Sequence, residues 1–288
     1  LQAASQDAQL WHDIIVAINQ ELELSKCSYH AIYYDFEPSG KPILACTEEP
    51  PGNLQINDVH GNPVSINYVP NSKPIKYLGL LQSPDNQRDH LAKLKKLAKN
   101  FSQVINCTNF SPKEARIFYQ AIYKPSMSYS LPLCHFTIQQ LEAVQSQAHR
   151  AIVAKCGYNR NTAKAILYGP HHLGGDAFSH LLDVQGLGQL QLFLKFWRHP
   201  EEDQGTLLRI AVAWAQYCAG ISRPIFEDTT INLPHLETKW FTSVRSYLRM
   251  IEGDLELSES MIPPLQRLAD VSLLKMLERV SALNLSST

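Results

Sequence analysis

The sequence predicts an α+β fold, in which a small helix-plus-hairpin portion precedes a mainly α-helical bundle and a helical extension. Two observations carry this prediction. Up to residue 84, short alternating segments are separated by turn residues, as in small antiparallel sheets. From residue 85 onward, apolar residues recur every three or four positions over long stretches, which is typical of helices. We therefore expect three parts, residues 1–84, 85–183 and 184–288.

The first part is predicted to begin with an amphipathic helix over residues 5–22, whose apolar stripe would pack on the core. A strand over residues 29–36 follows it, and a glycine-containing turn at 38–41 closes a first hairpin. A second hairpin joins residues 54–57 to residues 64–69. The apolar stripe of the helix consists of Leu10, Ile14, Ile15, Ala17 and Ile18.

Capping signals place the helices that follow. Ser111 and Glu114 form one capping box, and Thr137 and Gln140 form a second. The helix that begins at the first box should end near Pro125, because proline disrupts a helix interior. Further helices are predicted from about residue 85 to 105 and over about 178–197, 205–219, 235–252 and 264–283.

Charge is distributed unevenly along the chain, although the net charge is only −1. Residues 88–164 hold 12 Lys and Arg against 3 Asp and Glu, a balance of +9, whereas residues 1–87 hold 4 against 10 and residues 165–288 hold 10 against 14. A cationic surface gains affinity for a phosphate backbone by releasing its counterions. The basic segment therefore indicates a polyanionic partner, and a merely solvated helix surface is the alternative.

Composition restricts the classes of protein to which the chain can belong. A content of 44% hydrophobic and 18% charged residues is ordinary for a globular protein. No apolar run approaches the roughly 20 residues of a membrane span, and no signal sequence is visible. Wide, irregular cysteine spacings favour reduced thiols in an intracellular protein, cytoplasmic or nuclear and not secreted. The cysteines are Cys27, Cys46, Cys107, Cys134, Cys156 and Cys218.

A zinc site is not indicated by the sequence. Cys27 and His30 have a spacing found in zinc sites, and His171 and His172 are adjacent, but a structural site needs four converging ligands and no second matching pair exists. The first residue is Leu1 and not Met. We therefore expect no metal ligands in this chain and expect it to continue a longer protein.

Three features follow one another along the first 183 residues. Residues 22–27, Leu-Glu-Leu-Ser-Lys-Cys, lie between the predicted first helix and a strand. Residues 76–79, Lys-Tyr-Leu-Gly, form a predicted tight hairpin. Helices from about residue 88 to 183 come next, with Gly169-Pro170 and Gly174-Gly175 in a loop.

In this order the features resemble the fourth palm motif, the primer grip and the thumb of reverse transcriptases of non-LTR (LINE-like) retrotransposons. Residues 184–288 are similar to the variable C-terminal extensions of these elements. The chain departs from the family at Asn19 and Gln20, where glycine usually precedes the palm motif. Asparagine tolerates left-handed geometry and glutamine does so poorly.

The resemblance implies that the chain is the C-terminal fragment of an RNA-directed DNA polymerase. The catalytic aspartates of that family lie upstream of the palm motif, so this fragment would not polymerise alone. Magnesium is expected for the full polymerase, and no cofactor is expected in this chain. Lys26 would correspond to the basic residue that protonates the leaving pyrophosphate, since an ammonium can donate a proton. An exposed lysine before a strand is the alternative interpretation.

The expected partners are an RNA template and a DNA primer, bound through their backbones without regard to sequence, together with the upstream polymerase segment. The tight hairpin would approach the primer, a row of lysines would follow the duplex backbone, and a second basic edge would add phosphate contacts. The residues of these three groups are Tyr77, Leu78 and Gly79; Lys93, Lys96 and Lys99; and Arg150, Lys155, Arg160 and Lys164.

A non-catalytic helical interaction protein is the rival hypothesis. Its basic segment would bind an acidic partner or remain solvated, and Trp197, Trp214 and Trp240 would form a docking surface or a core. Cations that converge on one concave face would favour the polymerase fragment, and scattered cations would favour the rival.

Overall fold

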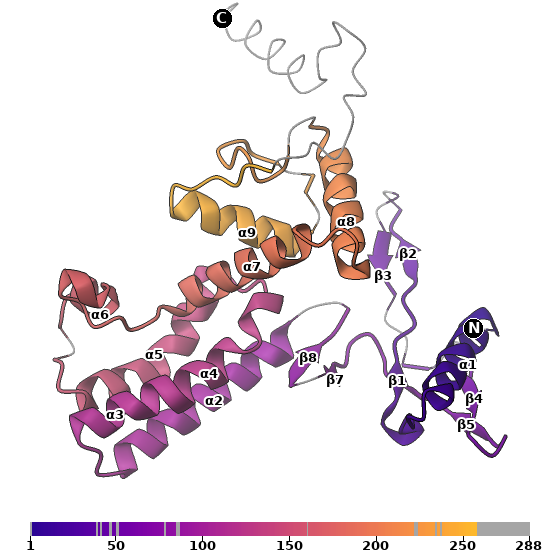
Figure 1. Cartoon of the computed structure of the whole chain (residues 1–288), viewed down its shortest axis with the longest axis horizontal. Helices are drawn as coiled ribbons and strands as arrows, with labels where there is room; N and C mark the ends of the chain where they lie inside the picture. The colour runs from indigo at the N-terminus through magenta and orange to yellow at the C-terminus, as the bar shows by residue number, and fades with distance from the viewer. Residues whose placement is uncertain are drawn as a thin grey trace, which may run out of the picture. The chain divides into compact units, whose positions relative to one another are not determined.

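The computed structural model describes residues 2–257, apart from positions 39, 41, 46–47, 50–51, 78, 85–86, 160, 222–223, 234 and 237. The chain divides into two compact units, Leu1–Lys93 and Leu94–Thr288. The described part of the first unit contains one long helix and short strand pairs, and that of the second is helical (Figure 1). The α+β class is confirmed at this coarse level. The helix predicted over 264–283 lies outside the described residues.

The strands of the first unit form two-stranded pairs. Three pairs are antiparallel hairpins whose turns contain Gly40, Gly61 and Gly79, with φ of 81°, 82° and 87°, a geometry that glycine adopts at little cost. The two hairpins predicted before residue 70 are confirmed, but the single strand predicted over 29–36 is divided between two pairs. The pairs are β1 (Ser28–Tyr29) with β6 (Asn67–Tyr68) in parallel, and β2 (Tyr34–Phe36) with β3 (Pro42–Leu44), β4 (Gln55–Asn57) with β5 (Pro63–Ser65) and β7 (Ile75–Tyr77) with β8 (Leu80–Gln82) in antiparallel.

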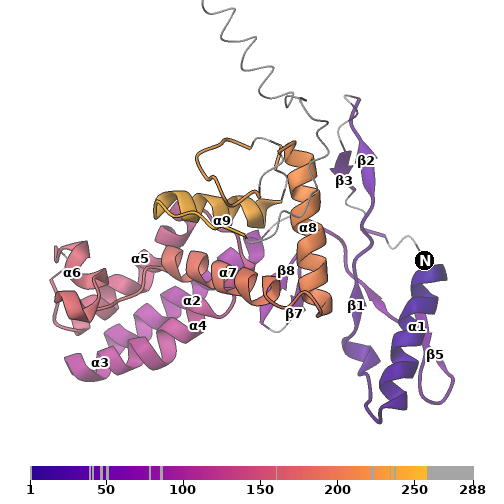
Figure 2. The ribbon, with the colours of Figure 1, turned by 45° about the horizontal axis from the view of Figure 1, so that its top comes forward.

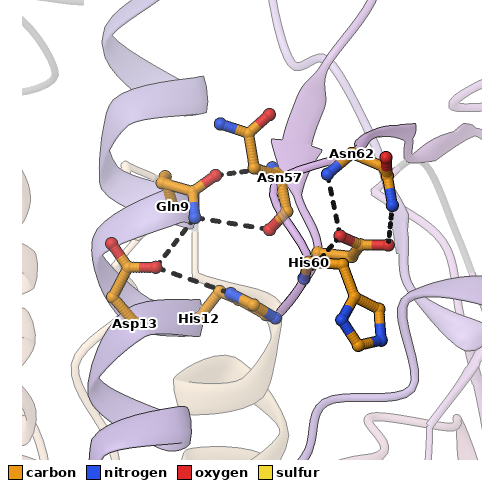
Figure 3. A network of polar contacts seen from close by, with 7 residues as sticks. Gln9, His12, Asp13, Asn57, His60 and Asn62 are labelled. Atoms are coloured by element: carbon orange, nitrogen blue, oxygen red, sulfur yellow. Dashed lines mark hydrogen bonds and ion pairs between the residues drawn. The ribbon is translucent and has the colours of Figure 1, made fainter.

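The first helix, α1 (Gln2–Ala17), packs with the opposite face from the one predicted. Gln9 and the backbone of Asn57 on β4 exchange hydrogen bonds of 2.6 and 3.4 Å (Figure 3). His12 is buried on the same face. The predicted stripe is corrected because these hydrogen bonds hold the polar face against β4, which leaves Leu10, Trp11, Ile14 and Ile18 exposed.

The basic segment begins with α2 (Arg88–Cys107) and α3 (Pro112–Phe118). The predicted capping box is present, with Ser111 and Glu114 each bonded to the other's backbone N–H. The predicted helix end near Pro125 is wrong, since a π turn (Tyr119–Tyr123) leads into α4 (Lys124–Ser128). Pro125 lies in the first turn of α4, where its missing N–H breaks no bond of that helix.

The helix α5 (Ile138–Lys155) starts at the predicted Thr137–Gln140 capping box. The turn after it contains Gly157, at a φ of 92°. The remaining elements are η3 (Leu131–Leu133), α6 (Lys164–Tyr168), η4 (His171–Leu173), α7 (Leu181–Trp197), α8 (Asp203–Ala219) and α9 (Lys239–Met250).

Two glycines lie inside α7 without interrupting it. A Cβ on Gly186 would lie 2.1 Å from the ring of Tyr247 on α9, and one on Gly188 would lie 2.6 Å from Pro132. These contacts explain why glycine occupies positions at which it weakens a helix. They allow α7 to pack closely between α9 on one side and the α2–α4 helices on the other (Figure 2).

Buried glutamines on α7 hold the segment that precedes α5. The amide of Gln185, 1% exposed, accepts from Phe136 N at 3.2 Å and donates to Phe136 O at 3.0 Å. Gln189 donates to Cys134 O at 2.6 Å, and Ser243 of α9 bonds to both glutamines. An irregular buried segment thus has its backbone groups satisfied by side chains.

The three tryptophans of the rival hypothesis do not form one surface. Trp197 is buried in an apolar core with Phe193 and Phe226. Trp240 is half-buried and donates from Nε1 to Pro132 O at 2.8 Å. Trp214 is 63% exposed on α8.

Gln185→Leu should destabilise the chain by roughly 2–4 kcal/mol, because each orphaned buried backbone group at Phe136 costs about 1–3 kcal/mol and leucine recovers part of this through apolar burial. Gln191→Leu, the same substitution at an exposed position of α7, should change the free energy of unfolding by less than about 0.5 kcal/mol. Urea denaturation measures both values. Equal effects would show that the glutamine clamp does not stabilise the fold.

Candidate nucleic-acid interface

Lys26 ends the turn η1 (Leu24–Lys26) and its side chain is 80% exposed. Its Nζ lies 3.5 Å from the carboxylate of Glu23. A hydrogen bond from Ser25 and the charge of Lys26 lower the pKa of Glu23. Before this motif, Asn19 adopts a φ of 58°, so the residue that tolerates left-handed geometry is the one that carries it. The role of Lys26 as a proton donor stays a prediction.

The β7–β8 hairpin is fixed to the first turns of α2. Lys93 Nζ donates to Gly79 O, and Leu81 N donates to Nδ1 of His90 at 3.3 Å. Tyr77 is 65% exposed. Leu78 lies outside the described residues. The tight hairpin is therefore confirmed as a structure, and its contact with a primer stays a prediction.

The predicted row of lysines on α2 does not lie on one face. Because successive helical residues are rotated by about 100°, Lys93, Lys96 and Lys99 are spread over about 120°. Lys95 and Lys99 do share a face, since they are four residues apart. The same spacing continues that face through Ser102 and Asn106.

This face of α2 borders a shallow open groove of about 570 Å³. Ser102 and Asn106 form its α2 side, and Arg150 is the one charged side chain among its described lining residues. The α5 side consists of Ser146, Gln147, Arg150, Ala151 and Ala154. We name this feature the α2–α5 groove. It combines hydrogen-bonding side chains with a cation, and the two alanines leave room for a ligand.

The second predicted basic edge is divided. Arg150 lines the α2–α5 groove, whereas Lys155 donates from Nζ to Thr108 O at 3.1 Å and ties the end of α5 to the end of α2. Lys164 is exposed at the start of α6. Arg160 lies outside the described residues. Sequence reasoning missed Lys95, although its spacing from Lys99 is the signal that places it beside the groove.

Acidic side chains of the basic segment lie away from the groove lining. Asp89 is in the first turn of α2. Glu114 is engaged in the capping box, where hydrogen bonds from Ser111 lower its pKa. Glu142 is on α5, rotated by about 110° from the centre of the groove-lining residues. The described lining therefore has a net positive charge.

Other kinds of site were sought in the described part of the chain. Within it, no group of three or more His, Cys, Asp or Glu side chains is arranged to hold a metal ion. None of its helices is both long and apolar enough to cross a membrane. The described cysteines are free thiols.

The hairpin contact of His90 should be sensitive to acid. Burial, with Lys93 nearby, lowers the pKa of His90 from 6.5 to about 4. The unfolded chain therefore takes up a proton near pH 6.5 that the folded chain resists, so stability is present above pH 6.5 and is lost as the pH falls toward 4. Hydrogen exchange at the Leu81 amide, corrected for its intrinsic rate, should accelerate over this window.

His90→Gln should remove this acceleration, because the variant has no imidazole to protonate. His149 has its pKa lowered to about 4 as well, mainly by burial, and lies in the other unit. His149→Gln should therefore leave the exchange profile of Leu81 unchanged. An acid response of Leu81 that persists in His90→Gln would rule out the proposed coupling.

Comparisons of the chain with protein-family models, with curated proteins and with solved structures find no match. The resemblance to reverse transcriptases of non-LTR retrotransposons therefore depends on the order of the sequence motifs.

Proposed function

We propose that the chain is the C-terminal fragment of an RNA-directed DNA polymerase and that it grips an RNA–DNA template-primer duplex through the α2–α5 groove. The observation that carries this proposal is the groove itself, in which Arg150 and the Lys95–Lys99 face of α2 adjoin hydroxyl and amide side chains. The motif order in the sequence supports it independently. The catalytic aspartates and their magnesium ions belong, on this proposal, to an upstream segment.

The chemistry of the groove suits a phosphate backbone. Arginine binds phosphate oxygens through charge-assisted hydrogen bonds, and Ser, Asn and Gln side chains are frequent backbone contacts. Cationic side chains on α2, beside Ser102 and Asn106, would add counterion release along a strand. Contacts of this kind position a duplex without reading its bases, as a polymerase requires.

The hairpin residues have a supporting role in this proposal. Tyr77 is exposed and Gly79 makes the turn tight, so the backbone is accessible to a primer strand. Lys93 holds Gly79 O, which makes it a positioning residue. Lys26 remains the candidate acid for the leaving pyrophosphate, and its role requires the upstream segment.

A second candidate function is favoured by α8. Leu207, Ile210, Trp214 and Tyr217 are exposed at helical spacing, and the rings of Trp214 and Tyr217 stack with centroids 5.7 Å apart. An uncharged aromatic face of this kind is characteristic of interaction surfaces. It favours a non-catalytic interaction protein, in which the basic segment would meet an acidic polypeptide.

The double variant Lys99→Gln, Arg150→Gln tests the first proposal. Its affinity for an RNA–DNA hybrid should fall about tenfold or more, and the slope of log affinity against log salt should become shallower by about 2, since each lost phosphate contact releases about one counterion fewer. Fluorescence anisotropy over a salt series measures both quantities.

Lys113→Gln, Lys195→Gln is the matched control, because it removes two exposed lysines that do not line the groove. It should retain nearly full affinity and salt slope. Equal losses in the two double variants would contradict a site at the groove. Tighter binding of polyglutamate than of the hybrid would favour the interaction protein.

A further inference from the structure

A second groove lies on the helical unit, between α7, α9 and the segment that leads into α5. It has a volume of about 680 Å³, which is within the range of small-molecule sites. Its lining comes from His135, Phe136, Thr137 and Ile138; from Leu182, Gln185 and Gly186; and from Leu236, Lys239, Thr242, Ser243, Ser246, Tyr247 and Met250. We name it the α7–α9 groove.

Hydrogen bonds fix the direction in which the groove runs. Cys134 bonds to Gln189 and Phe136 bonds to Gln185, so the chain before α5 runs antiparallel to α7. Ser243 bonds to Gln185 and Gln189, and Tyr247 lies against Gly186. The first turn of α9 therefore lies beside His135, and its last turn lies beside Leu182 and Ile138.

The two ends of the groove differ in polarity. Lys239 and His135 lie at one end, where burial and the charge of Lys239 lower the pKa of His135. His135 is thus neutral, and Lys239 supplies the positive charge. Lys239 has no ion-pair partner among the described residues. The opposite end is apolar, since Ile138, Leu182 and Met250 line it.

We propose that the α7–α9 groove binds a small amphipathic carboxylate, such as a medium-chain fatty acid, with its carboxylate at Lys239 and its chain extending toward Leu182 and Met250. The distance along α9 from Lys239 to Met250 is about 16 Å at the helical rise per residue. An elongated apolar ligand with one anionic end matches this length and this polarity gradient. The hydroxyls of Thr242, Ser243 and Ser246 lie along the wall between the two ends.

The proposal is independent of the nucleic-acid site, because the two grooves share no lining residue. The anionic end of the ligand would make a charge-assisted hydrogen bond with Lys239. The apolar end would gain from the removal of its surface from water. Neither contribution requires a phosphate or a base, so a duplex would not compete for this groove.

Titration of the full chain with dodecanoate at neutral pH, followed by calorimetry, tests the proposal. We expect saturable binding of one dodecanoate, weakened about tenfold in Lys239→Met because a charge-assisted contact is lost. Dodecanol, which lacks the charge, should bind equally to the two proteins. Ser246→Trp should abolish binding of both ligands by filling the groove.

Two exposed positions provide matched controls. Lys195→Met removes a lysine of α7 that does not line the groove, and Thr206→Trp adds an indole to α8. Both should bind dodecanoate as the unchanged chain does. Absence of saturable binding, an unaltered affinity in Lys239→Met, or full binding by a folded Ser246→Trp chain would overturn the proposal.

Discussion

The buried amide clamp of Gln185 and Gln189 is the constraint on which the helical unit depends. These two side chains satisfy the backbone of residues 134–136, which has no regular partner of its own. They also bind Ser243, so a single face of α7 holds α9 and the start of α5 together. Polar groups buried this deeply are stable only when each one is paired, which specifies one arrangement of the three segments.

The position of both grooves follows from this clamp. Gln145 of α5 accepts from Leu181 N at 2.7 Å, so α5 is also fixed to the first turn of α7. At its other end, α5 is tied to α2 through Lys155 and Thr108. The face of α5 that carries Arg150 is thereby held beside α2. The α7–α9 groove lies on the other side of the same framework.

Net charge overstates the cationic surface available to a ligand. Arg116 forms an ion pair of 2.9 Å with Asp176 and lies over the ring of Phe178. Arg245 donates to the carbonyls of Ile225 and Ile231 inside the α7–α9 part of the fold. Such cations stabilise loops by satisfying buried carbonyls. The side chains left for a polyanion are therefore a smaller set than the charge balance of +9 suggests.

Local signals in the sequence were sufficient for helix starts and tight turns. The capping boxes at Ser111 and Thr137 and the turn glycines were predictable because each depends on residues only a few positions apart. The packed face of α1 was not, since Gln9 finds its partner 48 residues away on β4. The π turn before Pro125 also depends on packing and not on propensity. Of the candidate site, Arg150 and Lys99 were predictable, whereas the groove itself required α2 and α5 to be placed side by side.

The central claim, that the α2–α5 groove holds the duplex backbone, is tested most directly by photocrosslinking. An RNA–DNA hybrid with a photoreactive group on its phosphate backbone would be irradiated with the full chain, and the attached peptides identified by mass spectrometry. The account predicts crosslinks to α2 between Lys95 and Asn106 and to α5 between Ser146 and Ala154. Crosslinks confined to other helices, such as α8, would contradict it.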